Sequence, residues 1–281
     1  MTHYITLNRA RNVKKHYENF PVASLLFPRK QREAATILYQ FARECDDIAD
    51  EGSLTAKQRM THLLEYKKGV SEINSGITPT NPLFVDIKHI CDEFSLEPDL
   101  LDRLMTAFEQ DITKDRYETM GEVVDYCHKA ACPAGEMILT LFGAKNTVTV
   151  KLSNHLCIAL AMIGMIQDIH EDFLKNRIYI PKEYFKQFNV TETDIHHKAF
   201  TPDWERLKKL WLDIIDHHIG SGEALKNHLT GRLKLQIKVL ISASRLLSKR
   251  MKQDKSNLFV KSPTLTKWDW GILLFKAIIR P

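Results

Sequence analysis

Two pairs of aspartates are spaced as if to act together. Asp46 and Asp50 lie four residues apart, and so do Asp168 and Asp172. On a helix, residues four apart share one face, so each pair would present two carboxylates in one direction. Carboxylates gathered in a cavity are costly unless cations compensate them, and Mg²⁺ is typically held by carboxylate and phosphate oxygens. The two pairs therefore suggest a metal-bridged diphosphate site.

The same spacing also arises by chance. The chain holds 18 aspartates in 281 residues, so about one such pair is expected without any function. A third pair, Asp111 and Asp115, has Lys114 and Arg116 beside it, which predicts a solvated or salt-bridged helix face. For the other two pairs, spacing alone leaves a metal site and an ordinary charged face as open alternatives.

The residues around the second pair favour the metal site. In the long apolar stretch before it, Cys157, Ala161 and Gly164 fall on the same helical face as the aspartates, and their small side chains leave room for a hydrocarbon chain. Downstream, Arg177 is suited to hold an anion and Tyr179 to donate a hydrogen bond. An acidic metal end joined to an apolar tunnel is what a prenyl diphosphate requires.

Helical periodicity dominates the chain that must position these residues. Apolar residues recur at three- and four-residue steps, and neither an alternating strand series nor a glycine-rich nucleotide loop appears. Hydrophobic residues make up 44% and charged residues 27% of the chain, as in ordinary folded proteins. No long linker divides the chain, so we predict one all-α domain over residues 1–281. Helices are expected at residues 29–50, 53–73, 82–94, 98–112, 120–141, 148–173, 201–218 and 220–251.

Composition also limits the partners and the compartment. A formal net charge of +5 suits an anionic small molecule or a lipid surface and does not indicate nucleic acid. The five cysteines form no CxxC pair, which favours a reducing compartment, and no secretory signal is visible. The longest apolar run, at 156–166, is about eleven residues, where a spanning helix needs roughly 20. We predict a cytoplasmic protein, at most peripheral at the inner face of a membrane.

Several segments together resemble the squalene/phytoene synthase family. The resemblance is carried by residues 16–24, 39–52, 110–117, 125–135 and 168–181, and residues 262–270 are similar to the C-terminal end of that family. It implies an isoprenoid-synthase helical bundle with a central cavity, in which two aspartate-rich helices face each other. Matched residue by residue, it implies that Asp46, Asp50, Asp168 and Asp172 hold Mg²⁺ on the substrate diphosphate. It also implies substrate-contacting roles for Phe20, Tyr39, Arg43, Arg177 and Tyr179.

Two departures from the family pattern bear on the reaction. Lys129 stands where squalene and phytoene synthases carry a tyrosine, and with the ending Pro133 to Gly135 it resembles the hydroxysqualene synthase branch. That branch implies presqualene diphosphate as substrate, received from the enzyme that makes it, and a product passed to a hydroxysqualene-processing enzyme. Ala161 and Gly164 replace the family's usual glutamine and asparagine, which puts one metal contact in question. A condensing prenyltransferase and a non-catalytic isoprenoid-binding protein remain open alternatives.

The C-terminal stretch, residues 267–280, combines two tryptophans and several large aliphatic residues with basic residues. This composition suits a segment lying in a membrane interface. A helix packed on the domain, with Ile272, Leu273 and Phe275 filling core, explains the same residues equally well. The sequence leaves both interpretations open.

Overall fold

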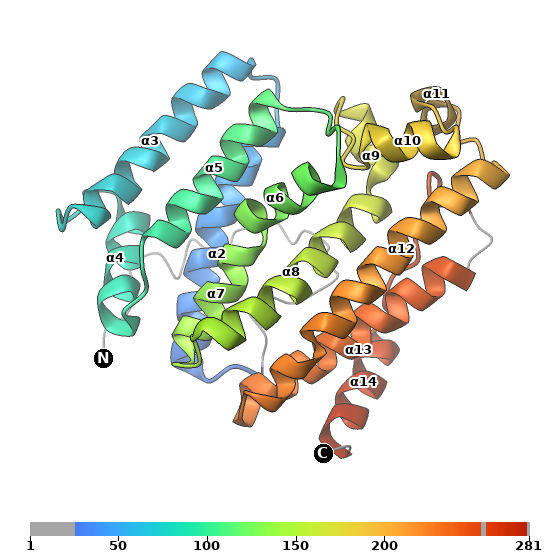
Figure 1. The fold of residues 1–281 in the computed structure, drawn as a ribbon. Coiled ribbons are helices and arrows are strands. Elements are labelled where there is room, and N and C mark those ends of the chain that lie inside the picture. The colour runs from blue at the N-terminus through green and yellow to red at the C-terminus, as the bar shows by residue number, and fades with distance from the viewer. Residues whose placement is uncertain (1–25, 254–256, 280–281) are drawn as a thin grey trace. The chain divides into compact units, whose positions relative to one another are not determined.

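The computed structural model describes residues 26–253 and 257–279, and their regular elements are helices, apart from one isolated bridge between two extended segments (Figure 1). The predicted all-α class is confirmed. One candidate residue, Phe20, lies outside the described residues. The chain divides into two compact units: residues 1–113 with 133–150, and residues 114–132 with 151–281. One domain over the whole chain stays a prediction.

The first unit is built around an amphipathic helix that carries the first aspartate pair. It contains α2 (Arg29–Asp50), α3 (Ala56–Asn74), α4 (Pro82–Phe94), α5 (Asp99–Thr113) and most of α7 (Cys132–Leu141). The rings of Phe41, Tyr66 and Phe84 join α2, α3 and α4, with centroids 5.6–6.3 Å apart. Gly69 permits this approach, because a Cβ there would lie 2.7 Å from the Phe84 ring.

The second unit contains the remaining helices. These are α6 (Met120–Ala130), most of α8 (Thr147–Gln167), α9 (Ile169–Leu174), α10 (Lys182–Phe188), α11 (Glu192–His196), α12 (Pro202–Gly222), the 3₁₀ turn η1 (Glu223–Asn227), α13 (Gly231–Gln253) and α14 (Lys267–Ile279). In Figure 1, α13 lies between α12 and α14. Trp211 is fully buried on α12, and its indole N–H donates to the Met162 carbonyl of α8 at 3.0 Å.

Hydrogen bonds from a distant segment hold the end of α8, just before the second aspartate pair. The Ser262 hydroxyl donates to the Gln167 carbonyl at 2.8 Å, and the Gln167 amide donates to the Pro263 carbonyl at 2.7 Å. The segment that resembles the C-terminal end of the family thus fixes the residue that precedes Asp168.

Three expected helices are divided in the structure. The helix predicted at 120–141 is α6 and α7, because Pro133 lacks an N–H and its ring clashes with the preceding turn, so it fits only at a helix start. The helix predicted at 148–173 is α8 and α9, which meet at Asp168. Residues 220–251 divide among the end of α12, η1 and α13, while α10 and α11 were not expected.

Among the described helices, α8 is long and apolar enough to cross a membrane, by its length and by the composition of its most apolar window. Half of that window is buried inside the structure, and the core helix of a soluble protein passes the same test. Length and composition alone are weak evidence for a membrane span.

Candidate functional site

The first aspartate pair lies at the C-terminal end of α2, in the first unit. Arg43 pairs with three neighbouring carboxylates: its Nη1 lies 2.8 Å from Asp46 Oδ2, and its Nη2 lies 2.6 Å from Asp47 Oδ1 and 2.9 Å from Glu51 Oε1. Partial burial acts to lower the pKa of Arg43, but the three carboxylates outweigh it and raise that pKa. The motif therefore carries a cation of its own.

Arg59, on α3, holds the end of α2 in place. Its guanidinium donates to the carbonyls of Ile48 at 2.8 Å, Glu51 and Gly52 at 3.0 Å, and Leu54 at 3.1 Å. Ile48 lies in the last turn of α2, where carbonyls have no partner within the helix, and the other three acceptors follow the helix end. These bonds therefore satisfy groups that would otherwise need water. Sequence reasoning missed Arg59, because it is one of several charged residues in a predicted helix.

The second aspartate pair lies at a bend in the second unit. Asp168 has φ −99° and ψ 10° and separates α8 from α9. Its N–H donates to the Gly164 carbonyl at 2.9 Å, and the Asp172 N–H donates to the Asp168 carbonyl at 2.8 Å. The helical bonding therefore continues across the bend, and the two aspartates keep the one-turn spacing that the sequence predicted.

Asp168 differs from the carboxylates of the first motif in its electrostatics. Its side chain keeps access to solvent, but the surrounding protein displaces enough water to raise the pKa of Asp168 to about 6. Glu171 adds to this increase, and Lys175 opposes it. Among the described residues, the Asp168 carboxylate has neither a hydrogen-bond nor an ion-pair partner. A hard cation would fit this uncompensated oxygen donor.

Two extended segments of the second unit position Arg177 and Tyr179. They form a parallel bridge between Arg116 and Ile178, and the Ile178 N–H donates to the Asp115 carbonyl at 3.0 Å. Arg177 is 8% exposed, and its Nη1 donates to the Tyr179 hydroxyl at 3.2 Å. The structure therefore brings these two predicted residues together. It contradicts the single helix face predicted for Asp111 and Asp115, because α5 ends at Thr113.

A cluster of three tyrosines extends this group. The rings of Tyr117, Tyr126 and Tyr179 lie with centroids 5.2–5.7 Å apart, and the Tyr126 and Tyr179 hydroxyls are 3.2 Å apart. Tyr117 is fully buried and Tyr126 is 7% exposed. The hydroxyl contact adds a polar link from Tyr126 through Tyr179 to Arg177.

The predicted hydrocarbon face of α8 is only partly covered. Cys157, Ala161 and Gly164 are half-buried, whereas Ile163 and Ile166 on the other side of the helix are fully buried. A Cβ added to Gly164 would have no described atom within 4 Å. Space therefore exists beside this face.

Lys129 is half-buried near the end of α6, one turn after Tyr126. It belongs to the second unit, as do Arg177 and Tyr179, whereas Tyr39 and Arg43 belong to the first. The predicted substrate-binding residues are therefore divided between the two units. A common diphosphate site that joins them stays a prediction.

The predicted magnesium site also draws on both units, two aspartates from each. Within the described parts of the chain, no group of three or more His, Cys, Asp or Glu side chains is placed to hold a metal ion. The donors in both pairs are carboxylate oxygens, which suit Mg²⁺. The residue types fit the metal, and its binding remains a prediction.

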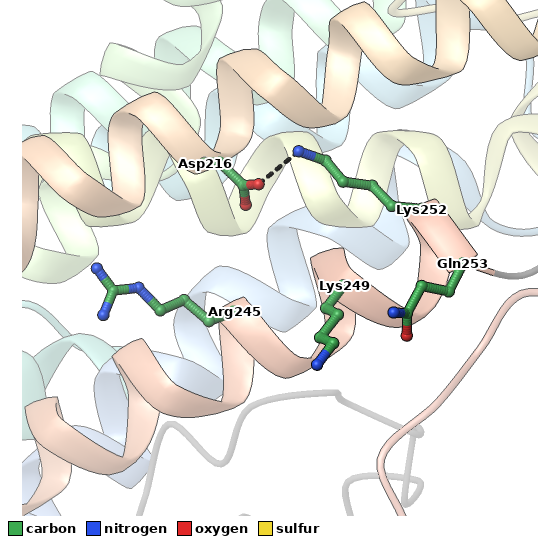
Figure 2. A pocket seen from close by; sticks show the side chains of 5 residues that line it. All are labelled: Asp216, Arg245, Lys249, Lys252 and Gln253. Atoms are coloured by element: carbon green, nitrogen blue, oxygen red, sulfur yellow. Dashed lines mark hydrogen bonds and ion pairs between the residues drawn. The ribbon is translucent and has the colours of Figure 1, made fainter.

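A hollow of about 480 Å³ lies elsewhere in the second unit, between α12 and α13 (Figure 2). Its lining residues are Asp216, Arg245, Lys249, Lys252 and Gln253. Figure 2 shows Lys252 directed toward Asp216, and these side chains pair at 2.6 Å. Its charged walls do not suit a hydrocarbon, and none of the predicted site residues lines it.

Comparisons with known proteins agree with this helical fold and these motifs. The model of the squalene/phytoene synthase family matches residues 13–269, so the chain belongs to that family of isoprenoid-processing enzymes. A crystal structure of squalene synthase from Alicyclobacillus acidocaldarius aligns with a TM-score of 0.80 and 29% identity, covering 88% of this chain and 92% of that one. The isoprenoid-synthase fold expected from the sequence is confirmed.

The curated relatives that match this chain include proteins named hydroxysqualene synthase. The one from Rhodopseudomonas palustris is 35% identical over 194 residues, which cover 68% of this chain and 65% of the relative. The one from Sinorhizobium fredii is 34% identical over 167 residues, which cover 59% of this chain and 56% of the relative. The matched part thus spans somewhat less than two thirds of each relative.

Proposed function

We propose that this chain is a hydroxysqualene synthase, which converts presqualene diphosphate and water into hydroxysqualene and pyrophosphate. The observation that carries the proposal is the similarity to two curated proteins of that name, at 34% and 35% identity. Lys129, in place of the tyrosine of condensing enzymes, supports the same branch.

The reaction begins by breaking the bond between the substrate carbon and the diphosphate oxygen. Pyrophosphate leaves with the bonding electrons, and a carbocation remains on the hydrocarbon. Asp46, Asp50, Asp168 and Asp172 are the residues that would hold Mg²⁺, which supplies positive charge for the leaving diphosphate. Opening of the cyclopropane ring moves the cation, and a water oxygen then forms the new C–O bond and loses one proton.

The chain's own cations suit the leaving group. Arg177 is buried and its guanidinium donates to the Tyr179 hydroxyl, so it would bind a diphosphate oxygen with little further ordering. Lys129 would lie toward the diphosphate, because a fixed positive charge disfavours a nearby carbocation. The face of α8 that carries Ala161 and Gly164 would accept the hydrocarbon.

The experiment is a comparison of substrates with the full chain and Mg²⁺. Release of pyrophosphate from presqualene diphosphate, with hydroxysqualene identified by mass spectrometry, is the expected result. Removal of Mg²⁺ with EDTA should abolish the release, and added Mg²⁺ should restore it. No pyrophosphate release from either presqualene diphosphate or farnesyl diphosphate would leave only a binding or assembly role.

A condensing prenyltransferase is the second candidate, because the solved structure at 29% identity is that of a squalene synthase. Such an enzyme would act on farnesyl diphosphate alone. Turnover of farnesyl diphosphate by the wild-type chain would therefore favour this candidate over hydroxysqualene synthase.

A further inference from the structure

Helix α14 presents a row of large apolar side chains to solvent. These residues recur at steps of four, three and four, which places them on one face of the helix. Their exposed fractions are high: Trp268 84%, Ile272 50%, Phe275 64% and Ile279 60%. On the opposite face, Leu273 and Ala277 are buried. Of the three residues that a packed helix would place in the core, Leu273 is buried, whereas Ile272 and Phe275 are exposed.

The attachment of α14 to α13 fixes the direction of this exposed row. Arg250 pairs with Asp269 at 2.6 Å near the start of α14, and the Lys238 ammonium donates to the Ala277 carbonyl near its end. The two helices therefore run antiparallel. These polar contacts and the buried Leu273 hold one face of α14 against the unit, so the apolar row faces outward.

The positive charge of the chain is concentrated in the same region. Residues 231–281 hold twelve of the 40 Lys and Arg residues but only two of the 35 Asp and Glu residues. Helix α13 contains seven Lys or Arg and no acidic residue, and three of these cations, Arg245, Arg250 and Lys252, pair with carboxylates of other elements. Lys267 and Lys276 border the apolar row, are exposed, and have no ion-pair partner among the described residues. These two exposed lysines make the border of the row suited to an anionic partner.

We propose that the outward face of α14 docks on an anionic lipid bilayer. A helix of 13 residues is about 20 Å long, too short to span a bilayer but suited to lie in its interface. Interfacial helices bury aromatic and aliphatic side chains to a depth of about 5–10 Å while their basic residues contact anionic headgroups. Helix α14 matches this mode, because it exposes a tryptophan, aliphatic side chains and two lysines that pair with none of the described carboxylates.

The docking does not require the proposed reaction, although an enzyme acting on water-insoluble hydrocarbons would gain direct access to its substrate. The experiment is flotation of the full chain with vesicles of phosphatidylcholine alone, or of phosphatidylcholine containing phosphatidylglycerol. We expect binding to the anionic vesicles, weaker binding to neutral ones, and a decline as salt increases.

Two double variants separate the contribution of the apolar row to vesicle binding from nonspecific adsorption of exposed apolar side chains. Trp268→Gln with Phe275→Gln should weaken vesicle binding at least tenfold. The matched control is Leu64→Gln with Ile77→Gln, which removes two large apolar side chains that are 53% and 55% exposed elsewhere, and it should bind as the wild type does. Because all four side chains are exposed, both variants should keep the wild-type unfolding temperature.

A double lysine variant isolates the electrostatic contribution to vesicle binding. A basic residue close to an anionic surface changes binding about fivefold, so Lys267→Gln with Lys276→Gln should weaken binding to anionic vesicles by about tenfold or more. Binding to neutral vesicles should change little. An equal loss on both kinds of vesicle would contradict the anionic preference.

Three further results would overturn the proposal: no vesicle binding by the full chain, equal binding by the apolar variant and the wild type, or a dimer that the apolar variant converts to monomers without any vesicle binding. The last result would assign the surface to a second copy of the chain. Vesicle binding with no pyrophosphate release would support docking while the proposed reaction alone fails.

Discussion

The two acidic motifs share a spacing but differ in how the chain compensates their charge. At the end of α2, Arg43 lies within ion-pair distance of Asp46, Asp47 and Glu51. At the junction of α8 and α9, the surrounding protein raises the pKa of Asp168 to about 6, and no described residue pairs with its carboxylate. Asp46 is thus paired within its own motif, whereas Asp168 leaves a charge that an external cation would satisfy.

This difference separates stability from function. A carboxylate that pairs with a neighbouring arginine contributes to the fold even when no ligand is bound. A carboxylate whose pKa is raised by its surroundings has an unfavourable charged form in the folded state at neutral pH. The second motif is therefore where the loss of a carboxylate should harm activity without harming stability.

The largest effect is expected for Asp168→Asn. If Asp168 holds Mg²⁺, kcat/KM for pyrophosphate release should fall at least 100-fold, which corresponds to about 2.7 kcal/mol. In metal-free buffer at neutral pH, the unfolding temperature should stay the same or rise, because the variant removes an unfavourable charge. The gain should be below about 1 kcal/mol, since the side chain has access to water.

The pH dependence checks the sign of this effect. The folded-state pKa of Asp168, about 6, is higher than its ordinary value of 3.8. The ionised carboxylate therefore lowers stability as pH rises from about 4 to 6, and the full cost is present above that range. The stability gain of Asp168→Asn should vanish below pH ~4. Asp213→Asn, which removes an exposed carboxylate paired with Lys252, serves as the control and should keep full activity.

Asp46→Asn tests the other side of the comparison. We expect kcat/KM to fall at least tenfold, or about 1.4 kcal/mol, because a proposed metal ligand is lost. Unlike Asp168→Asn, it should also lower stability, by about 0.5 kcal/mol, because Arg43 loses one of its three ion-pair partners. Asp92→Asn, at an exposed surface pair with Lys88, is the matched control. An Asp46→Asn enzyme that keeps more than a tenth of wild-type kcat/KM would not support a metal role for Asp46.

The sequence predicted the positions of both motifs but not their difference. Helical periodicity and the four-residue spacing are local properties. The helix that carries Asp46, predicted at residues 29–50, therefore has the same bounds in the structure. The bend at Asp168 was not predicted, because the helical periodicity of apolar residues continues beyond Asp168. The last turn of α8 is instead fixed by Ser262, which lies far away in sequence. Distant contacts of this kind leave no periodic signal.

Arg59, in the first unit, is a second residue whose contacts could not be predicted from the sequence. Its four backbone contacts are invisible in sequence, yet they hold the end of the helix that carries Asp46 and Asp50. Arg59→Gln should lower the free energy of unfolding by about 1 kcal/mol, because the exposed carbonyls can exchange the guanidinium for water. Activity should fall several-fold through the less ordered motif.

The control for this variant is Arg29→Gln, at the opposite end of α2, where Glu33 is the one ion-pair partner of the arginine among the described residues. It should change stability by less than about 0.5 kcal/mol and leave activity unchanged. Equal effects of the two variants would mean that Arg59 does not position the first motif. Thermal unfolding and the pyrophosphate assay measure both.

The smallest effect is expected at Tyr126, whose hydroxyl contacts Tyr179 in the second unit. Tyr126→Phe keeps the packed ring and removes one hydrogen bond, which is worth about 1 kcal/mol or less to stability. The Tyr179 hydroxyl would keep its bond from Arg177, so substrate binding should weaken only twofold to threefold, seen as a higher KM with kcat nearly unchanged. Tyr184→Phe, which lies outside this cluster, is the control. A large loss of kcat in Tyr126→Phe would instead indicate that its hydroxyl acts in the chemical step, and the second motif would then depend on a wider polar network than Asp168 and Arg177.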